Sequence, residues 1–229
     1  MTVDPGRNRA RGGRPIVHDE AAMLEAAARA ILKRGYSGLR YSDVSEESGV
    51  PVPSLQHRFL TLDRLRRAAL CRKVRLELDE HVQSLAHLTD PWAWVLAMIE
   101  RTIAGEPAQR EAEWRLWIQY QHAACYDPEL AADYDELELL WLSAVHEVIV
   151  RGTMQGRFRP VMSTWDAARA LQGMIDGLGA PLALPKPDSF VRELVRMLND
   201  CAAQLLHPQE IAEPCAGSVD STAHALTQI

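Results

Sequence analysis

Two short helix-forming segments, residues 42–48 and 53–59, follow each other with only a four-residue turn between them. The turn begins with Gly49, and glycine readily adopts the left-handed backbone conformation that ends a helix. Val44 and Leu55 are placed to face a common core from the two helices. Two short helices joined by a tight glycine-containing turn form a helix-turn-helix. This segment therefore predicts a small helical unit whose second helix exposes its first residues to a partner.

Most of the remaining chain carries apolar residues at helical spacing, and no segment shows the alternation of a strand. Asp90-Pro91 and Asp127-Pro128 are strong helix starts, because Asp caps a helix and Pro fits its first turn. Further helices are expected to begin near Asp19, Leu62, Pro107, Thr164 and Asp188. The three prolines between residues 180 and 187 prevent a continuous helix there. The predicted fold class is all-α, with an N-terminal three-helix helix-turn-helix domain and a larger C-terminal helical domain.

Charge is unevenly divided along the chain. Residues 1–75 hold 15 basic and 8 acidic side chains, whereas the remainder holds 10 basic and 23 acidic ones. A basic first third on an acidic body suggests that the first third meets a polyanion, although a chance fluctuation with a solvated basic arm gives the same balance. That arm, residues 1–16, carries Arg7, Arg9, Arg11 and Arg14, which could reach a minor groove or simply remain solvated.

Several classes of protein are disfavoured. The four cysteines, Cys71, Cys125, Cys201 and Cys215, are far apart in the sequence, so we expect neither a zinc site nor a disulfide framework, and no cofactor. No apolar run approaches the roughly 18 residues of a membrane span, and the N-terminus does not look like a secretory signal. The chain has no nucleophile elbow, phosphate-binding glycine loop or zinc-protease motif, so an enzyme is not expected. A cytoplasmic protein is predicted.

A series of short motifs within residues 23–59 resembles the DNA-binding domain of the TetR family of bacterial regulators. The motifs are Met23-Leu24-Glu25-Ala26-Ala27, Arg34-Gly35-Tyr36, Asp43-Val44, Ser48-Gly49-Val50, Ser54-Leu55 and His57-Arg58-Phe59. No single motif is diagnostic, and the resemblance rests on their joint order and spacing. Gly156-Arg157-Phe158-Arg159-Pro160 and Ile175-Asp176-Gly177-Leu178 are similar to the C-terminal half of many family members.

The resemblance implies that the helix at residues 53–59 enters the major groove of double-stranded DNA. The candidate DNA-binding residues are Arg40, Ser42, Val52, Pro53, Ser54, Gln56, His57 and Arg58. Arg40 can meet a phosphate, Gln56 can bond an adenine edge or the DNA backbone, and Val52 can contact a thymine methyl. The sequence departs from the family pattern at three places. Leu39-Arg40 stands where the family often has a capping Thr or Ser, Gln56 replaces a usual Tyr, and Leu62 replaces a phosphate-binding Lys. The candidates to replace that Lys are Arg58, Arg64, Arg66 and Arg67.

The resemblance also implies that the last two long helices pair with those of a second copy as a four-helix bundle. The dimer-interface candidates are Leu171, Ile175, Leu178, Leu194 and Leu198. The ligand-binding candidates, on helices where the family builds its cavity, are Trp92, Trp114, Trp117, Trp141 and His146. An aromatic cavity would suit an apolar or flat ligand, and filling of the core is the alternative role for each tryptophan. Asp176 is expected either to face such a cavity or to form a hydrogen bond within the dimer.

Together these features predict a ligand-responsive, sequence-specific DNA-binding regulator, and repression is the usual behaviour of the family. Its expected partners are a palindromic double-stranded operator, a second copy of the chain and a small-molecule effector. The alternative is a helical dimer that binds a small molecule or a protein and has lost DNA binding. The predicted divisions are a disordered basic arm (1–16), a DNA-binding domain (17–62), a ligand-binding and dimerisation domain (63–207) and a disordered tail (208–229).

Overall fold

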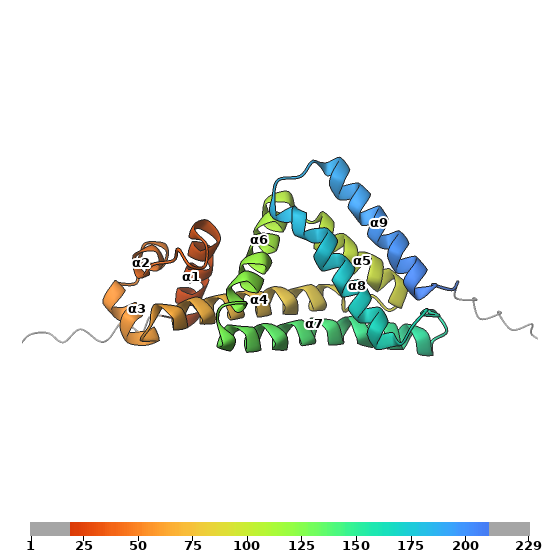
Figure 1. Cartoon of the computed structure of the whole chain (residues 1–229), viewed down its shortest axis with the longest axis horizontal. Coiled ribbons are helices and arrows are strands. Elements are labelled where there is room, and N and C mark those ends of the chain that lie inside the picture. Colours follow the sequence, from red (N-terminus) through yellow and green to blue (C-terminus); the bar gives the residue numbers. More distant parts are fainter. Residues whose placement is uncertain (1–18, 211–229) are drawn as a thin grey trace, which may run out of the picture. The chain divides into compact units, whose positions relative to one another are not determined.

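The computed structural model describes residues 19–210, so the predicted basic arm and most of the predicted tail lie outside the described residues. Every regular element between residues 19 and 210 is helical, as the predicted fold class requires (Figure 1). The elements are α1 (Glu20–Arg34), α2 (Tyr41–Ser48), α3 (Val52–Phe59), α4 (Leu62–Leu85), α5 (Pro91–Ala104), α6 (Pro107–Ala124), α7 (Pro128–Met154), α8 (Thr164–Gly179), the short 3-10 helix η1 (Ala180–Ala183) and α9 (Asp188–Leu206). The chain divides into two compact units, Met1–Lys73 and Val74–Ile229, and the boundary falls within α4.

In the first unit, α1 packs against α2, and α2 packs against α3. Asp19 caps α1 by accepting a hydrogen bond from the backbone N–H of Ala21 at 3.0 Å. The α2 helix ends at Gly49, whose φ of 71° is the left-handed conformation that this turn requires. Val44 and Leu55 are fully buried, which confirms that the two short helices share one core.

In the second unit, α5 and α8 both pack against α9, and α7 packs against α6 and α8 (Figure 1). The two Asp-Pro helix starts are confirmed. Asp90 accepts a hydrogen bond from the backbone N–H of Trp92 at 3.1 Å, and Asp127 accepts one from Glu129 at 3.0 Å. None of the helices between residues 19 and 210 has the length and apolar character that crossing a membrane demands.

All six tryptophans of the chain lie in the second unit. Trp114 is buried against α8 at Gly179, where a Cβ atom would come within 2.1 Å of the indole Cζ2. The indole N–H of Trp114 donates to the backbone carbonyl of Thr102 at 3.2 Å. Gly179 thus permits a close approach that ties together α5, α6 and α8. At Gly177, two residues before Gly179, no atom lies within 4 Å of the place of a Cβ.

Candidate DNA-binding and ligand-binding sites

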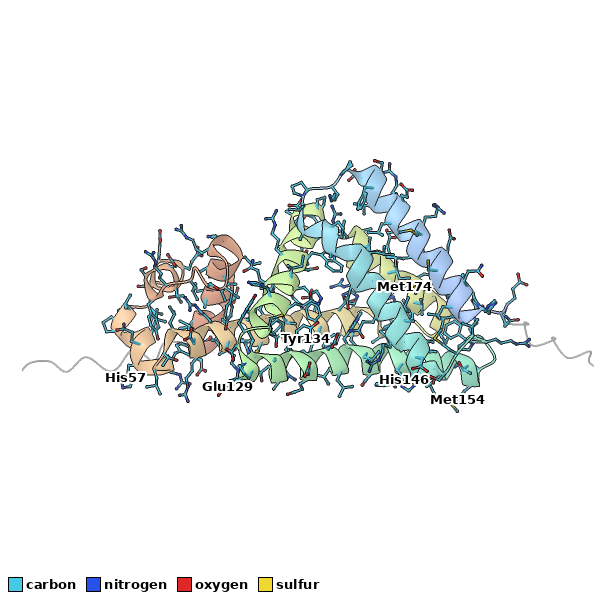
Figure 2. All side chains as sticks on the ribbon, viewed as in Figure 1. His57, Glu129, Tyr134, His146, Met154 and Met174 are labelled. Atoms are coloured by element: carbon cyan, nitrogen blue, oxygen red, sulfur yellow. The ribbon has the colours of Figure 1, made fainter. Side chains whose placement is uncertain are left out.

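The α3 helix presents a polar outer face. It begins at Val52, and Pro53 fits its first turn, where a backbone N–H has no partner within the helix. Leu55 is buried, and Val52 and Ser54 are half-buried. The other predicted DNA-binding residues are all exposed: Arg40, Ser42, Pro53, Gln56, His57 and Arg58 (His57 is labelled in Figure 2). The predicted residues are therefore accessible, or partly accessible, on the surface that a major groove would meet.

Arg40 occupies the position that normally supplies a capping side chain to α2. A guanidinium has only hydrogen-bond donors, so it cannot accept from the helix. Instead, Oδ2 of Asp43 accepts a hydrogen bond from the backbone N–H of Arg40 at 2.8 Å. The Arg40 side chain is left exposed at the start of α2, where a phosphate can reach it.

The basic residues that follow α2 differ in how far their charges are already engaged. Arg58 forms an ion pair with Glu20. Arg66 donates to two backbone carbonyls of the α1–α2 loop, the nearer being that of Leu39 at 2.6 Å. Arg64 is exposed. Arg64 is thus better placed than Arg66 to replace the phosphate-binding Lys, because Arg66 already holds the loop to α4.

The second unit contains a cavity of about 300 Å³, lined by residues of α4, α5, α6, α7 and α8. Three of the five predicted ligand-binding residues line it, namely Trp114, Trp117 and Trp141. The other lining residues are Val74, Glu77, Leu78, Glu80, His81, Arg101, Thr102, Gly105, Glu106, Gln109, Arg110, Glu113, Leu137, Ile175 and Asp176. Asp176 therefore takes the first of the two roles considered for it, facing the cavity.

Trp92 and His146, the other two predicted ligand-binding residues, do not line this cavity. Trp92 packs edge-on against Phe158, with ring centroids 6.2 Å apart. His146 packs edge-on against Trp165, at 4.9 Å between centroids, where α7 meets α8 (Figure 2). The contact of Trp92 is with the segment between α7 and α8, and that of His146 is with α8, so both rings pack outside this cavity wall.

Aromatic rings are grouped at two places in the cavity wall. Trp117 packs against Tyr134, with centroids 5.2 Å apart, where α6 meets α7 (Figure 2). Trp141 packs edge-on against His81 at 5.1 Å. Rings held in this way keep a fixed orientation, so their faces can form a preformed binding surface.

The cavity wall is acidic, with five carboxylate side chains against two guanidinium groups. Burial raises the pKa of Asp176 to about 6, and the nearby Glu138 carboxylate adds to the rise. Burial lowers the pKa of His81 to about 4, assisted by the charge of Arg101, so this imidazole is neutral at pH 7. Burial also raises the pKa of Tyr134 to about 12. The site therefore favours a cation over an anion near Asp176.

Two buried nitrogen atoms of the cavity residues have no hydrogen-bond partner within the described part of the chain: Nε of Arg110 and Nε1 of Trp117. Sequence reasoning did not single out Arg110 or His81, because each is an isolated polar residue in a helical stretch without a motif. Between residues 19 and 210, no three His, Cys, Asp or Glu side chains are grouped so as to hold a metal ion.

The predicted dimer residues are packed mainly against other residues of their own chain. Leu171, Ile175, Leu194 and Leu198 are buried in the core of the chain itself, and Leu178 packs against that core. The four buried side chains therefore leave little surface for a second copy, whereas the half-buried Leu178 leaves more, and their place in a dimer stays a prediction. The sides of α8 and α9 that remain exposed carry Gly173, Gly177, Phe190 and Met197.

A helix-turn-helix unit joined to a helical unit with an internal cavity is the architecture of a ligand-controlled transcriptional regulator. The family model of the C-terminal domain of BetI-type transcriptional repressors matches residues 91–207, half of the chain. The chain therefore belongs to the TetR family of transcriptional regulators, which are not enzymes, and its C-terminal domain is of the BetI type.

Solved structures agree with this assignment. A protein from Saccharomonospora viridis, classed as a transcriptional regulator and crystallised in complex with choline, is 26% identical, with a TM-score of 0.72 over 81% of this chain and 95% of that one. A TetR regulator from Haloarcula marismortui has the same fold at 17% identity, with a TM-score of 0.70 over 81% and 96% of the two chains. A regulator from Rhodococcus sp. Rha1, at 18% identity, gives a TM-score of 0.70 over 84% and 100%. No curated protein sequence matches the chain.

Proposed function

We propose that this repressor holds an operator through α3 and releases it when a small ammonium compound fills the cavity. The observation that supports this ligand class is the excess of carboxylates in an aromatic cavity wall, with Asp176 beside the rings. The faces of Trp117 and Trp141 can attract an alkylammonium group through their ring quadrupoles. The Saccharomonospora viridis protein was crystallised with choline, which is a compound of this class.

The proposed switch is a shift between two states of the protein. A ligand changes DNA affinity only to the extent that it binds the two states differently. The ligand would select a state in which the two recognition helices of a dimer no longer fit successive major grooves of a palindromic operator. Because it acts on the chromosome, the regulator would work in the cytoplasm.

The first experiment is recovery of sheared genomic DNA from the source organism with the purified protein, followed by sequencing. We expect one or a few sites that share an inverted repeat, and we expect choline to lower the affinity for a labelled repeat in fluorescence anisotropy. Uniform recovery, or none with and without choline, would favour the alternative of a helical dimer that has lost DNA binding. Unchanged affinity at saturating choline would remove the proposed effector class.

Gln56 and Arg64 are expected to contribute to DNA binding in different ways. Replacing Gln56 with Ala should weaken operator binding by about 1–3 kcal/mol and relax the preference at one base pair, because a bidentate contact to a base edge is lost. Replacing Arg64 with Ala should weaken binding to all sequences alike and reduce the salt slope by about 1. Anisotropy titrations at several salt concentrations, on the operator and a scrambled duplex, measure both. Equal losses on both duplexes for Gln56→Ala would assign it to the backbone.

We also propose that two copies pair through the exposed faces of α8 and α9. Phe190 and Met197 are large apolar residues, and each has 36% of its surface exposed to solvent. They lie seven positions apart on α9, so they share one face of that helix. Gly173 and Gly177 give α8 a shallow surface that a partner helix could approach closely. Such a two-fold dimer would match an inverted-repeat operator.

Replacing Met197 with Glu should convert the dimer to a monomer at micromolar concentration, because a carboxylate would be buried opposite its own copy. Sedimentation velocity measures the change. Leu139→Glu is the matched control, since Leu139 is an exposed leucine on α7, outside the proposed interface. A Met197→Glu protein that remains dimeric, or a Leu139→Glu protein that becomes monomeric, would place the interface elsewhere.

A further inference from the structure

Arg110 is a buried charged residue in the cavity wall, with only 4% of its surface exposed. Its one hydrogen bond within the described part of the chain runs from Nη1 to the backbone carbonyl of Gly105 at 3.2 Å. Nε is buried without a partner, and no carboxylate of the described residues lies within ion-pair distance. A buried guanidinium is costly unless a negative group compensates it. The described part of the chain therefore supplies no negative partner for the guanidinium of Arg110.

Three of the carboxylates that line the cavity with Arg110 are engaged elsewhere. Glu106 accepts a hydrogen bond from the backbone N–H of Gln109 at 2.9 Å, as the cap of α6. Glu113 accepts one from the Gln109 side-chain amide at 2.7 Å. Glu80 forms an ion pair with Arg101 at 3.6 Å. The two guanidinium groups of the cavity thus differ, since that of Arg101 has a carboxylate partner and that of Arg110 has none.

We propose that the ligand of this cavity is a zwitterion, in which an oxyanion bonds Arg110 while the ammonium group lies near Asp176 and the tryptophans. This inference rests on the proposed function and narrows its ligand class. The unpartnered Nε of Arg110 is a donor, so what it lacks is an acceptor oxygen. A simple alkylammonium ion carries no acceptor, whereas a carboxylate or phosphate matches the planar donor fork of an arginine.

The placement of the charged groups fits a molecule with separated charges. Arg110 and Trp117 lie seven positions apart on α6, which puts them on the same helical face with a rise of about 10 Å between them. Asp176 lies on α8 about one turn before Gly179, and Gly179 packs against Trp114. Arg110 and Asp176 thus reach the cavity wall from two different helices, α6 and α8. A cavity of about 300 Å³ suits a small ligand.

Calorimetric titration of the full-length protein with four compounds tests the proposal: choline, 4-(trimethylammonio)butanoate, the methyl ester of that acid, and phosphocholine. The acid and its ester share chain and ammonium group and differ in the negative charge. We expect the acid to bind at least about tenfold more tightly than the ester, because a charge-assisted bond to Arg110 is added. Tighter binding of phosphocholine than of the acid would identify the oxyanion as a phosphate.

The Arg110→Gln variant should lose the preference for acid over ester while binding the ester and choline with less than about threefold change. Arg110→Lys should retain part of the preference. Arg115→Gln is the control, because it removes the same charge from α6 at an exposed residue outside the cavity wall, and its preference should match that of the natural protein. The retained affinity for choline also shows that a variant is folded.

Equal affinity of the natural protein for acid and ester would overturn the zwitterion proposal while leaving the ammonium class intact. A preference that persists in Arg110→Gln would overturn the assignment of the oxyanion to Arg110. If choline, the acid, the ester and phosphocholine all fail to bind, the ammonium class itself is wrong, and the proposed function must change with it. Should Arg110→Gln not fold, the comparison of acid with ester in the natural protein still decides the charge of the ligand.

Discussion

Alanine at Gly179 is expected to lower the free energy of unfolding by about 2–4 kcal/mol, since overpacking and a lost hydrogen bond act together. The new Cβ would lie 2.1 Å from Cζ2 of Trp114, so the indole must move. Its hydrogen bond to the Thr102 carbonyl, now 3.2 Å long, would be strained or broken. Because Trp114 also lines the cavity, ligand affinity should fall as well.

Alanine at Gly177 is the matched control on the same helix. Within one copy of the chain no atom lies within 4 Å of the place of its Cβ, so in a monomer only the helix propensity changes, and the stability of the monomer should rise by up to about 1 kcal/mol. Urea unfolding followed by circular dichroism measures both variants in the Met197→Glu background, which we expect to be monomeric, so that the proposed dimer does not contribute to stability. Destabilisation of equal size at both positions would show that the contact with Trp114 is not the cause.

Replacing Asp176 with Asn should change binding and stability in opposite directions. Affinity for choline is expected to fall about 10- to 100-fold, because a nearby opposite charge is removed. The ligand-free protein should gain roughly 2 kcal/mol of stability at pH 7.5, because burial opposes the ionised form of this carboxyl, whose pKa is raised to about 6. Calorimetry and urea unfolding of the same sample give the two values. A loss of both affinity and stability would indicate a structural role instead.

The pH dependence follows from the raised pKa of Asp176, about 6 against an ordinary value of 3.8. The folded state holds this proton more tightly than the unfolded state, so the cost of ionising Asp176 is absent below pH 3.8 and grows as the pH rises to 6. The stability gain of Asp176→Asn should accordingly vanish near pH 4. Choline affinity of the natural protein should be about tenfold lower at pH 5 than at pH 7.5, since the carboxylate is then mostly protonated. His81, with a pKa of about 4, stays mostly neutral between pH 5 and pH 7.5, so it does not contribute to this change in affinity.

Local signals were sufficient to predict most of the helices. Asp90 and Asp127 cap α5 and α7 as expected, because capping depends on residues within one turn. The helix predicted to begin near Thr164 begins at that residue in the structure. The segment with three prolines forms the short η1 helix and then an extended approach to α9, as the missing N–H groups require.

The position of the cavity, and the partner of each apolar stripe, could not be predicted in the same way. An apolar stripe such as Leu171 and Leu198 has the same spacing whether it meets its own chain or a second copy. The cavity combines residues from five helices, among them His81, Arg110 and Asp176, which are far apart in the sequence. The sequence around a tryptophan does not show which neighbour its ring faces. Trp117, which lines the cavity, and Trp92, which packs against Phe158, were therefore equally good candidates for ligand binding.

The distribution of tryptophan gives this protein a natural optical label on one of its two units. Residues 1–73 contain no tryptophan, so emission excited near 295 nm originates entirely from the unit that holds the cavity. The unit that contains α3 has no indole whose emission bound operator DNA could quench or shift. Any change in emission when the operator is added must therefore have been transmitted from one unit to the other, which makes an unmodified sample a direct reporter of communication between them.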